Sequence, residues 1–139
     1  MLELCEIKLL GTIEMDPLVK EFGEVRTNEV IVTRERLRHI LERHPDDFEL
    51  FKTYGVECIE NPDYIIKDNK NERTIFVVKK LGDTNLNAIV RVVLEKDQEE
   101  LKNSVMTFYR IRDKNLKKLI KRNKLLYKKE YPLYNNHTI

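Results

Sequence analysis

The spacing of apolar residues changes near Pro62, and this change limits the chain to a small set of folds. Before Pro62, apolar side chains such as Leu37, Ile40 and Leu41 recur at intervals of three and four, the period of a helix that buries one side. After it, four segments rich in Val, Ile, Thr, Phe and Tyr have the composition of β-strands. These segments are 64–67, 74–80, 86–94 and 104–111. Helices followed by a run of strands indicate an α+β domain.

Helix-starting and helix-stopping residues divide the first part of the chain. Thr33 has a side chain that caps helices, and Pro17 and Pro45 suit the first turn of a helix. Gly23 and Gly55 are typical of the residue that follows a helix. From these signals we expect a strand over 2–13, a short helix over 16–22, an extended segment over 29–33, a helix over 33–44, a second helix over 45–55 and a short apolar run to 59.

The second part of the chain indicates a meander and a final helix. The connections between its strand segments contain turn-forming residues and are short, which favours antiparallel pairing of successive strands. Asp113 can cap a last helix that turns Leu116, Leu119 and Ile120 inward and its lysines outward.

The predicted fold is therefore α+β, with N-terminal helices packed on a four-stranded antiparallel meander, followed by a basic C-terminal helix. An open sheet of this kind leaves one face free to bind a ligand. The predicted divisions are an N-terminal strand and helix extension over 1–27, the α+β domain over 28–130 and a loose tail over 131–139.

Composition excludes several classes of protein. With 139 residues the chain has room for one domain and one core. No stretch approaches the roughly 20 apolar residues of a membrane span, and charged residues interrupt the apolar start, so we expect neither a membrane protein nor a signal peptide. Cys5 and Cys58 stand far apart without nearby histidines, which argues against a metal site. Nothing requires an oxidising compartment, so we expect a cytoplasmic protein.

The net charge of +2 conceals a strong asymmetry. Between residues 110 and 129 there are ten Lys or Arg and one Asp, so this segment carries +9 and the remainder of the chain carries −7. A basic block on a nearly neutral protein is typical of a surface that binds polyanions. A solvated helix face would account for the same charges.

A series of short motifs runs from residue 36 to residue 111. It comprises Arg36-Leu37-x-His39-Ile40-x-x-Arg43-His44-Pro45, Ile59-Glu60-Asn61-Pro62-Asp63-Tyr64-Ile65, the pair Lys79-Lys80, Arg91 within a strand, and Asn103-Ser104-Val105-Met106-Thr107-Phe108-Tyr109-Arg110-Ile111. In this order the series resembles the phage-associated subgroup of the barnase–EndoU–colicin–RelE-like nucleases, over about Glu29 to Lys129. The resemblance gives no counterpart for residues 1 to about 27.

The resemblance implies a metal-independent endonuclease fold without cofactors, in which helices pack on a four-stranded meander. Members of the wider group cleave RNA, often transfer RNA or messenger RNA, and commonly act as toxins. The implied partners are therefore RNA and an immunity or antitoxin protein. The implied place of action is the cytoplasm, either of the cell that makes the protein or of a target cell into which it is delivered.

The residue types present suit this chemistry. RNA cleavage without a metal uses the ribose 2′-hydroxyl as nucleophile, and it needs a base, an acid and cations that hold the growing charge of the phosphate. Histidine can serve as acid or base near neutrality because its ordinary pKa is about 6.5. The catalytic candidates are His39, His44, Arg91 and Thr107.

His39 and His44 lie five residues apart on one predicted helix, so their rings diverge by roughly 140°. His44 falls on the apolar side with Ile40 and Leu41 and points toward the sheet, whereas His39 falls on the polar side. A packed His44 and an ordinary surface His39 are equally good interpretations. The resemblance raises both as candidates without choosing between them.

The remaining candidates lie on predicted strands and on the last helix. Arg91, within a strand, must face solvent, pair with an acid or hold a ligand anion, and the resemblance favours the anion. Thr107 alternates with Val105 and Tyr109 on one face of its strand, although β-propensity alone accounts for many strand threonines. The substrate-binding candidates are Lys79, Tyr109, Arg110, Lys117 and Lys121.

Two functions fit these patterns. The first is a toxin-like RNA endonuclease, in which the basic terminal helix follows the RNA backbone. The alternative is a non-catalytic RNA- or protein-binding module on a nuclease-like scaffold. Histidine, arginine and threonine side chains that converge in one cleft would favour the enzyme, and scattered positions would favour the module.

Overall fold

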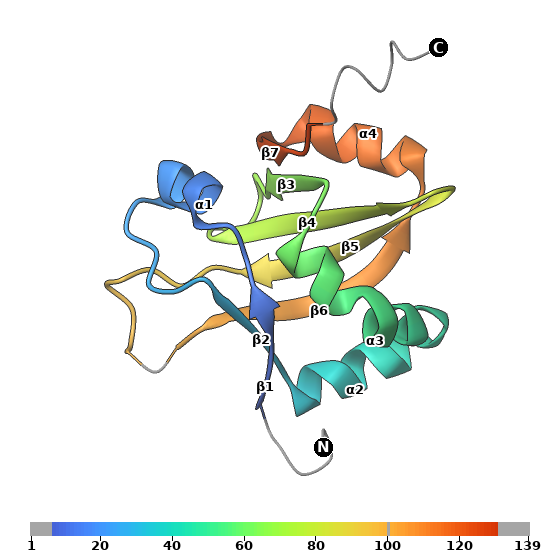
Figure 1. Cartoon of the computed structure of the whole chain (residues 1–139), viewed down its shortest axis with the longest axis horizontal. Coiled ribbons are helices and arrows are strands. Elements are labelled where there is room, and N and C mark those ends of the chain that lie inside the picture. Colours follow the sequence, from blue (N-terminus) through green and yellow to red (C-terminus); the bar gives the residue numbers. More distant parts are fainter. Residues whose placement is uncertain (1–6, 100, 131–139) are drawn as a thin grey trace.

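The computed structural model describes residues 7–99 and 101–130, and this part of the chain forms one seven-stranded sheet with four helices (Figure 1). The strands are β1 (Ile7–Thr12), β2 (Glu29–Thr33), β3 (Tyr64–Lys67), β4 (Thr74–Leu81), β5 (Thr84–Arg91), β6 (Asn103–Ile111) and β7 (Lys124–Lys128). The helices are α1 (Met15–Phe22), α2 (Arg34–Arg43), α3 (Pro45–Glu60) and α4 (Asp113–Arg122). The start of the first predicted strand, 2–6, and the predicted tail, 131–139, lie outside the described residues.

The predicted four-stranded antiparallel meander is wrong, because the sheet is larger and of mixed direction, in the order β1-β2-β6-β5-β4-β3-β7. Successive strands from β3 to β6 do pair antiparallel. However, β2, expected to be only an extended lead into a helix, pairs parallel with β6 and antiparallel with β1. Parallel pairing joins segments far apart in the sequence, so the local pattern around β2 does not reveal it.

The basic segment at the end also differs from the prediction, because its last part is a strand. α4 ends at Arg122, and β7 then pairs antiparallel with β3 at the edge of the sheet, next to α4 (Figure 1). Asn123 lies between the two elements. Its Nδ2 donates to the Leu119 carbonyl at 3.0 Å, and its Oδ1 accepts the backbone N–H of Asn69 at 2.9 Å. These two bonds end the helix and hold the chain where it reverses.

α3 continues through Gly55, where the sequence predicted its end. A Cβ at Gly55 would lie 3.2 Å from the Phe51 ring and 3.6 Å from the Leu10 side chain. The glycine therefore allows close packing of α3 on β1 and does not stop the helix. The helix ends at Glu60, two residues before Pro62.

The two faces of the sheet have different covers. On one, the α3 face, side chains such as Val77 and Phe108 belong to a main core shared with α1, α2 and α3. On the other, the α4 face, Val78 and Ile111 form a smaller cluster with Leu116 of α4. Figure 1 shows α3 in front of β5 and β6, with α4 beside β3 at one end of the sheet.

Candidate functional site

Three predicted site residues share the α4 face of the sheet. Side chains alternate along a strand, so Arg91 lies on the face opposite Val90, which is part of the main core. On β6, Thr107 and Tyr109 flank Phe108, another residue of the main core. The fold therefore turns Arg91, Thr107 and Tyr109 toward the same side.

A β-bulge in β6 changes part of the predicted alternation. The register of β5 and β6 shifts between Ile89, opposite Thr107, and Val90, opposite Val105. Val105 is buried in the main core, so it does not share a face with Thr107 as the sequence predicted. The extra residue at Met106 accounts for the change, because a bulge re-aims the side chains that follow it.

His44 reaches the α4 face from the corner between α2 and α3. Its ring stacks on that of Tyr109, with 5.3 Å between the ring centroids and 30° between the planes. The N–H of His44 donates to the Ile40 carbonyl at 2.8 Å, and its own carbonyl accepts the N–H of Asp47 at 2.9 Å. Pro45 disfavours a helical backbone at the residue before it, and His44 adopts φ −136° and ψ 60°. Both helices thus fix the position of this histidine.

A buried carboxylate joins this corner to the sheet. Asp47 is 8% exposed, and its Oδ2 accepts the backbone N–H of Arg110 at 3.1 Å while its Oδ1 accepts from the Arg110 guanidinium. β2 pairs with β6 near Asn103 and Ser104, at the other end of β6. Asp47 therefore accepts the backbone N–H of Arg110 on β6, at a position where β2 does not pair with β6. Arg110, a predicted substrate-binding residue, holds the corner that positions His44.

A cavity of about 420 Å³ lies beside Tyr109, between α4 and the sheet, and we call it the α4 groove. Its floor and wall include Phe76, Tyr109, Ile111, Asn115, Lys118 and Arg122, and the β3–β4 turn borders it. Both cations are exposed. Tyr109 belongs to the groove and to the His44 stack. It therefore connects a residue that can transfer protons with a cationic cavity.

Other predicted residues lie away from the groove. The Nζ of Lys79 donates to the carbonyl of Asn61 at 2.9 Å, at the end of α3. His39 is half-buried in α2, and its side chain has no hydrogen-bond or ring partner within the described part of the chain. Lys117 and Lys121 are exposed on α4 but do not line the groove.

Arg91 shares the face of Tyr109 but lies far along it. Asn87 is the residue opposite Tyr109, and Arg91 is four residues further along β5, about 14 Å away. Arg91 lines a second recess of about 270 Å³, beside the ion pair of Arg73 and Asp97. Arg91 therefore cannot bind an anion that is held next to His44, although it could bind a second anion in its own recess.

Two buried asparagines on this face were not predicted. Asn85 and Asn87 are fully buried in β5. The Nδ2 of Asn85 donates to Asp113 at 2.9 Å and so joins the start of α4 to the sheet. Neither amide atom of Asn87 has a hydrogen-bond partner among the described residues, and the same is true of the buried Thr107 hydroxyl. Asparagine is depleted in strands, so the Asn85-x-Asn87 spacing was a signal available in the sequence.

The described part of the chain contains neither a group of metal ligands nor a membrane-spanning helix. No group of three His, Cys, Asp or Glu side chains there could hold a metal ion. No helix there has the length and apolar character needed to cross a membrane.

A family model matches residues 6–128, and its description is phage-Barnase-EndoU-ColicinE5/D-RelE like nuclease 2. The chain belongs to this nuclease family. Membership confirms the resemblance carried by the motifs. The match also takes in β1 and α1 of this nuclease, for which the motifs gave no counterpart. No curated protein and no solved structure matches the chain.

Proposed function

We propose that this nuclease is an RNA endonuclease that cleaves by attack of the ribose 2′-hydroxyl on the adjacent phosphate, with His44 as its acid–base residue. The observation that carries the proposal is the stacking of His44 on Tyr109 at the edge of the α4 groove. It supports this chemistry because a proton-transfer residue and a cationic cavity meet at one side chain.

Each group has one role in the proposed reaction. His44 takes the proton of the 2′-hydroxyl, and the 2′-oxygen bonds to phosphorus as the bond to the 5′-oxygen breaks. The imidazolium then returns a proton to the departing 5′-oxygen. Lys118 and Arg122 offset the charge that grows on the phosphate, and the Tyr109 hydroxyl orients one of its oxygens. Arg91 binds another phosphate of the same strand.

Cleavage of total RNA in the presence of a chelator tests this mechanism, since no step of it uses a metal ion. The fragments should end in 2′,3′-cyclic phosphate and 5′-hydroxyl groups. His44→Ala should lower the rate by about 10²–10⁴-fold, the usual loss for one acid–base group. His44→Phe should lose as much, because phenylalanine keeps a ring on Tyr109 but cannot transfer a proton.

His39→Ala is the matched histidine control, and its rate should stay within a few-fold of wild type. Thermal unfolding of each variant separates lost chemistry from lost folding. Cleavage of a 2′-deoxy substrate would rule out attack by the 2′-hydroxyl. Full activity of His44→Phe would remove His44 from the reaction.

Two observations favour a second function, the non-catalytic RNA- or protein-binding module, because the histidine, arginine and threonine candidates do not converge in one cleft. Arg91 lies about 14 Å along the sheet from the residue opposite Tyr109 and lines a separate recess. The Thr107 hydroxyl is buried, so it is not offered to a phosphate at the surface. In that case the wild-type protein would bind RNA or a protein and release no fragments.

A further inference from the structure

The α4 groove combines an apolar floor with a cationic wall. Phe76 of β4, Tyr109 of β6 and the neighbouring Ile111 form the floor. Lys118 and Arg122 line the wall from α4. A ligand that fits this combination has a flat ring with a negative charge beside it.

Hydrogen bonds between the β3–β4 turn and α4 fix the width of the groove. The backbone N–H of Asn69 donates to the Asn123 side chain at 2.9 Å. The side-chain Nδ2 of Asn69 donates to the Arg122 carbonyl at 2.7 Å. Asp68, which is buried, accepts the backbone N–H of Lys70 at 2.8 Å and so shapes the turn. A cavity held in this way needs little ordering when a ligand binds.

The two cations of the wall are available to a ligand. Lys118 and Arg122 are four residues apart on α4, a spacing that places side chains on one side of a helix. Neither has an ion-pair partner among the residues that the structure describes. Lys117 and Lys121 have the same spacing but do not line the groove, so they offer a matched comparison.

We propose that the α4 groove binds one unpaired nucleotide of the RNA strand, with its base stacked on Phe76 and Tyr109 and its phosphate held by Lys118 and Arg122. This inference rests on the proposed function, because the nucleotide belongs to the strand that is cut. The base must be unpaired, since a base inside a duplex has no free face for an aromatic ring. Because Tyr109 also contacts His44, the bound nucleotide lies next to the cleaved bond.

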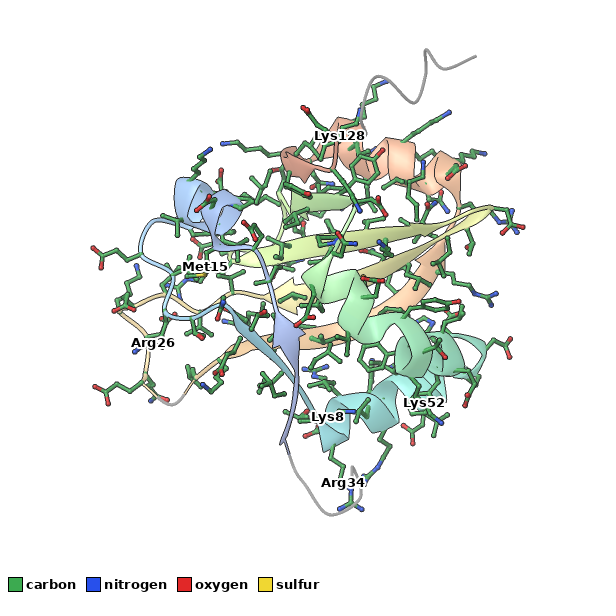
Figure 2. All side chains as sticks on the ribbon, in the orientation of Figure 1. Lys8, Met15, Arg26, Arg34, Lys52 and Lys128 are labelled. Carbon is green, nitrogen blue, oxygen red and sulfur yellow. The ribbon has the colours of Figure 1, made fainter. Side chains whose placement is uncertain are left out.

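Binding of a fluorescent, single-stranded 2′-O-methyl RNA oligonucleotide tests the cationic wall, because this probe lacks the nucleophile and stays intact. The Lys118→Ala/Arg122→Ala protein should bind at least about tenfold more weakly, the loss expected for one or more charge-assisted contacts. Lys117→Ala/Lys121→Ala removes the same charge and should lose no more than about threefold, through long-range attraction alone. Arg34→Ala should bind like wild type, because Arg34 is far from the groove. Lys128 lies close to α4, and Arg34 lies at the opposite end of the molecule (Figure 2).

An abasic nucleotide placed at successive positions of the same oligonucleotide tests the aromatic floor. At one position the missing base should weaken binding to wild type by about tenfold, the usual effect of one base stacked on an aromatic ring. Phe76→Leu should weaken binding of the intact oligonucleotide by a similar factor. It should also remove the sensitivity to the abasic position.

Two outcomes would overturn the nucleotide site and leave the proposed chemistry standing. They are equal losses in the two double variants and an abasic effect that Phe76→Leu leaves unchanged. Normal RNA cleavage by Lys118→Ala/Arg122→Ala would overturn the nucleotide site and also remove these two cations from the proposed reaction. A wild-type protein that neither binds the oligonucleotide nor cleaves RNA would overturn the proposed function as well. Circular dichroism confirms that each variant is folded.

Discussion

Asn87 has a carboxamide that is fully buried and has no hydrogen-bond partner among the described residues. A buried donor or acceptor left unpaired costs about 1–3 kcal/mol, in domains whose whole stability is about 5–15 kcal/mol. Asn87 stands opposite Tyr109 on β6, within the candidate site. Residues that break a rule of folding concentrate at functional sites. We therefore interpret the unpaired amide as part of the site and not as part of the scaffold.

Asn87→Leu keeps the approximate shape of the side chain and removes the unpaired amide. We predict that it raises the free energy of unfolding by about 1–3 kcal/mol, measured by urea denaturation. Asn87→Asp should lower it, because an uncompensated charge is then buried at the same place. If Asn87→Leu destabilises the protein as much as Asn87→Asp does, the amide is hydrogen-bonded in solution and this interpretation is wrong.

Glu21 joins α1 to two strands of the sheet. Its carboxylate lies 2.7 Å from the Lys124 ammonium on β7 and 2.9 Å from that of Lys67 on β3. Hydrogen bonds from Lys124 and then Lys67 lower the pKa of Glu21 below its ordinary value. A lowered pKa means that these contacts stabilise the fold above the unfolded pKa of about 4.3. The stabilisation disappears as the pH falls through the folded pKa below that value.

Glu21→Gln should therefore lower the free energy of unfolding at pH 7, by less than about 1 kcal/mol because the pairs reach solvent. At a pH well below about 4.3 the variant and wild type should become equally stable, since both side chains are then neutral. Urea denaturation at the two pH values measures the difference. Glu24→Gln, at an exposed glutamate with no ion pair among the described residues, should change neither value. A deficit that stays constant with pH would mean that Glu21→Gln disturbs packing.

Helix boundaries could be predicted from the sequence where a local signal sets them. Thr33 was expected to cap the helix that follows, and its hydroxyl accepts the backbone N–H of Arg36 at 3.1 Å. The prediction of which residues of that helix face the core was less accurate. His44 does contact the sheet, but Leu41, assigned to the same apolar side, is 47% exposed. His44 is the residue that joins two helices, so helical periodicity does not set its direction.

The partners of β2 and β7, and the lysine that lines the groove, could not be predicted, because they depend on distant segments. β2 is a strand through its pairing with β6, and β7 through its pairing with β3. The amphipathic pattern of α4 shows which side meets the sheet. The position where the β3–β4 turn meets α4 decides which of the flanking lysines lines the groove. Lys118 lines it and Lys117 does not.

Cys58 lies in the main core, so the reactivity of its thiol can be used to measure unfolding of the domain. Its thiol is fully buried and donates to the Val77 carbonyl at 3.3 Å, and burial raises its pKa to about 12. The thiolate is the reactive form of cysteine. The native protein therefore protects this thiol from reagents at neutral pH.

In a Cys5→Ser background, we predict that iodoacetamide modifies Cys58 only through unfolding, at a rate that rises steeply with urea. A ligand that binds the folded state alone increases its stability, so the 2′-O-methyl RNA oligonucleotide should slow modification. Mass spectrometry over time measures the rate. Modification without urea that is as fast as in the unfolded protein would show that the core around Cys58 opens locally.

The order of the candidate site along the chain bears on its assembly during translation. A ribosome makes His44 early, but the ring on which it stacks belongs to β6, and the cationic wall of the groove comes later still, in α4. The bond between Asn69 and Asn123 forms after both. A domain generally folds as a unit during synthesis, and a nascent chain that stops before Arg122 has a histidine but no complete groove. For an enzyme proposed to cut RNA, the message being translated and the ribosome itself meet a complete site only after all of β6 and α4 have emerged.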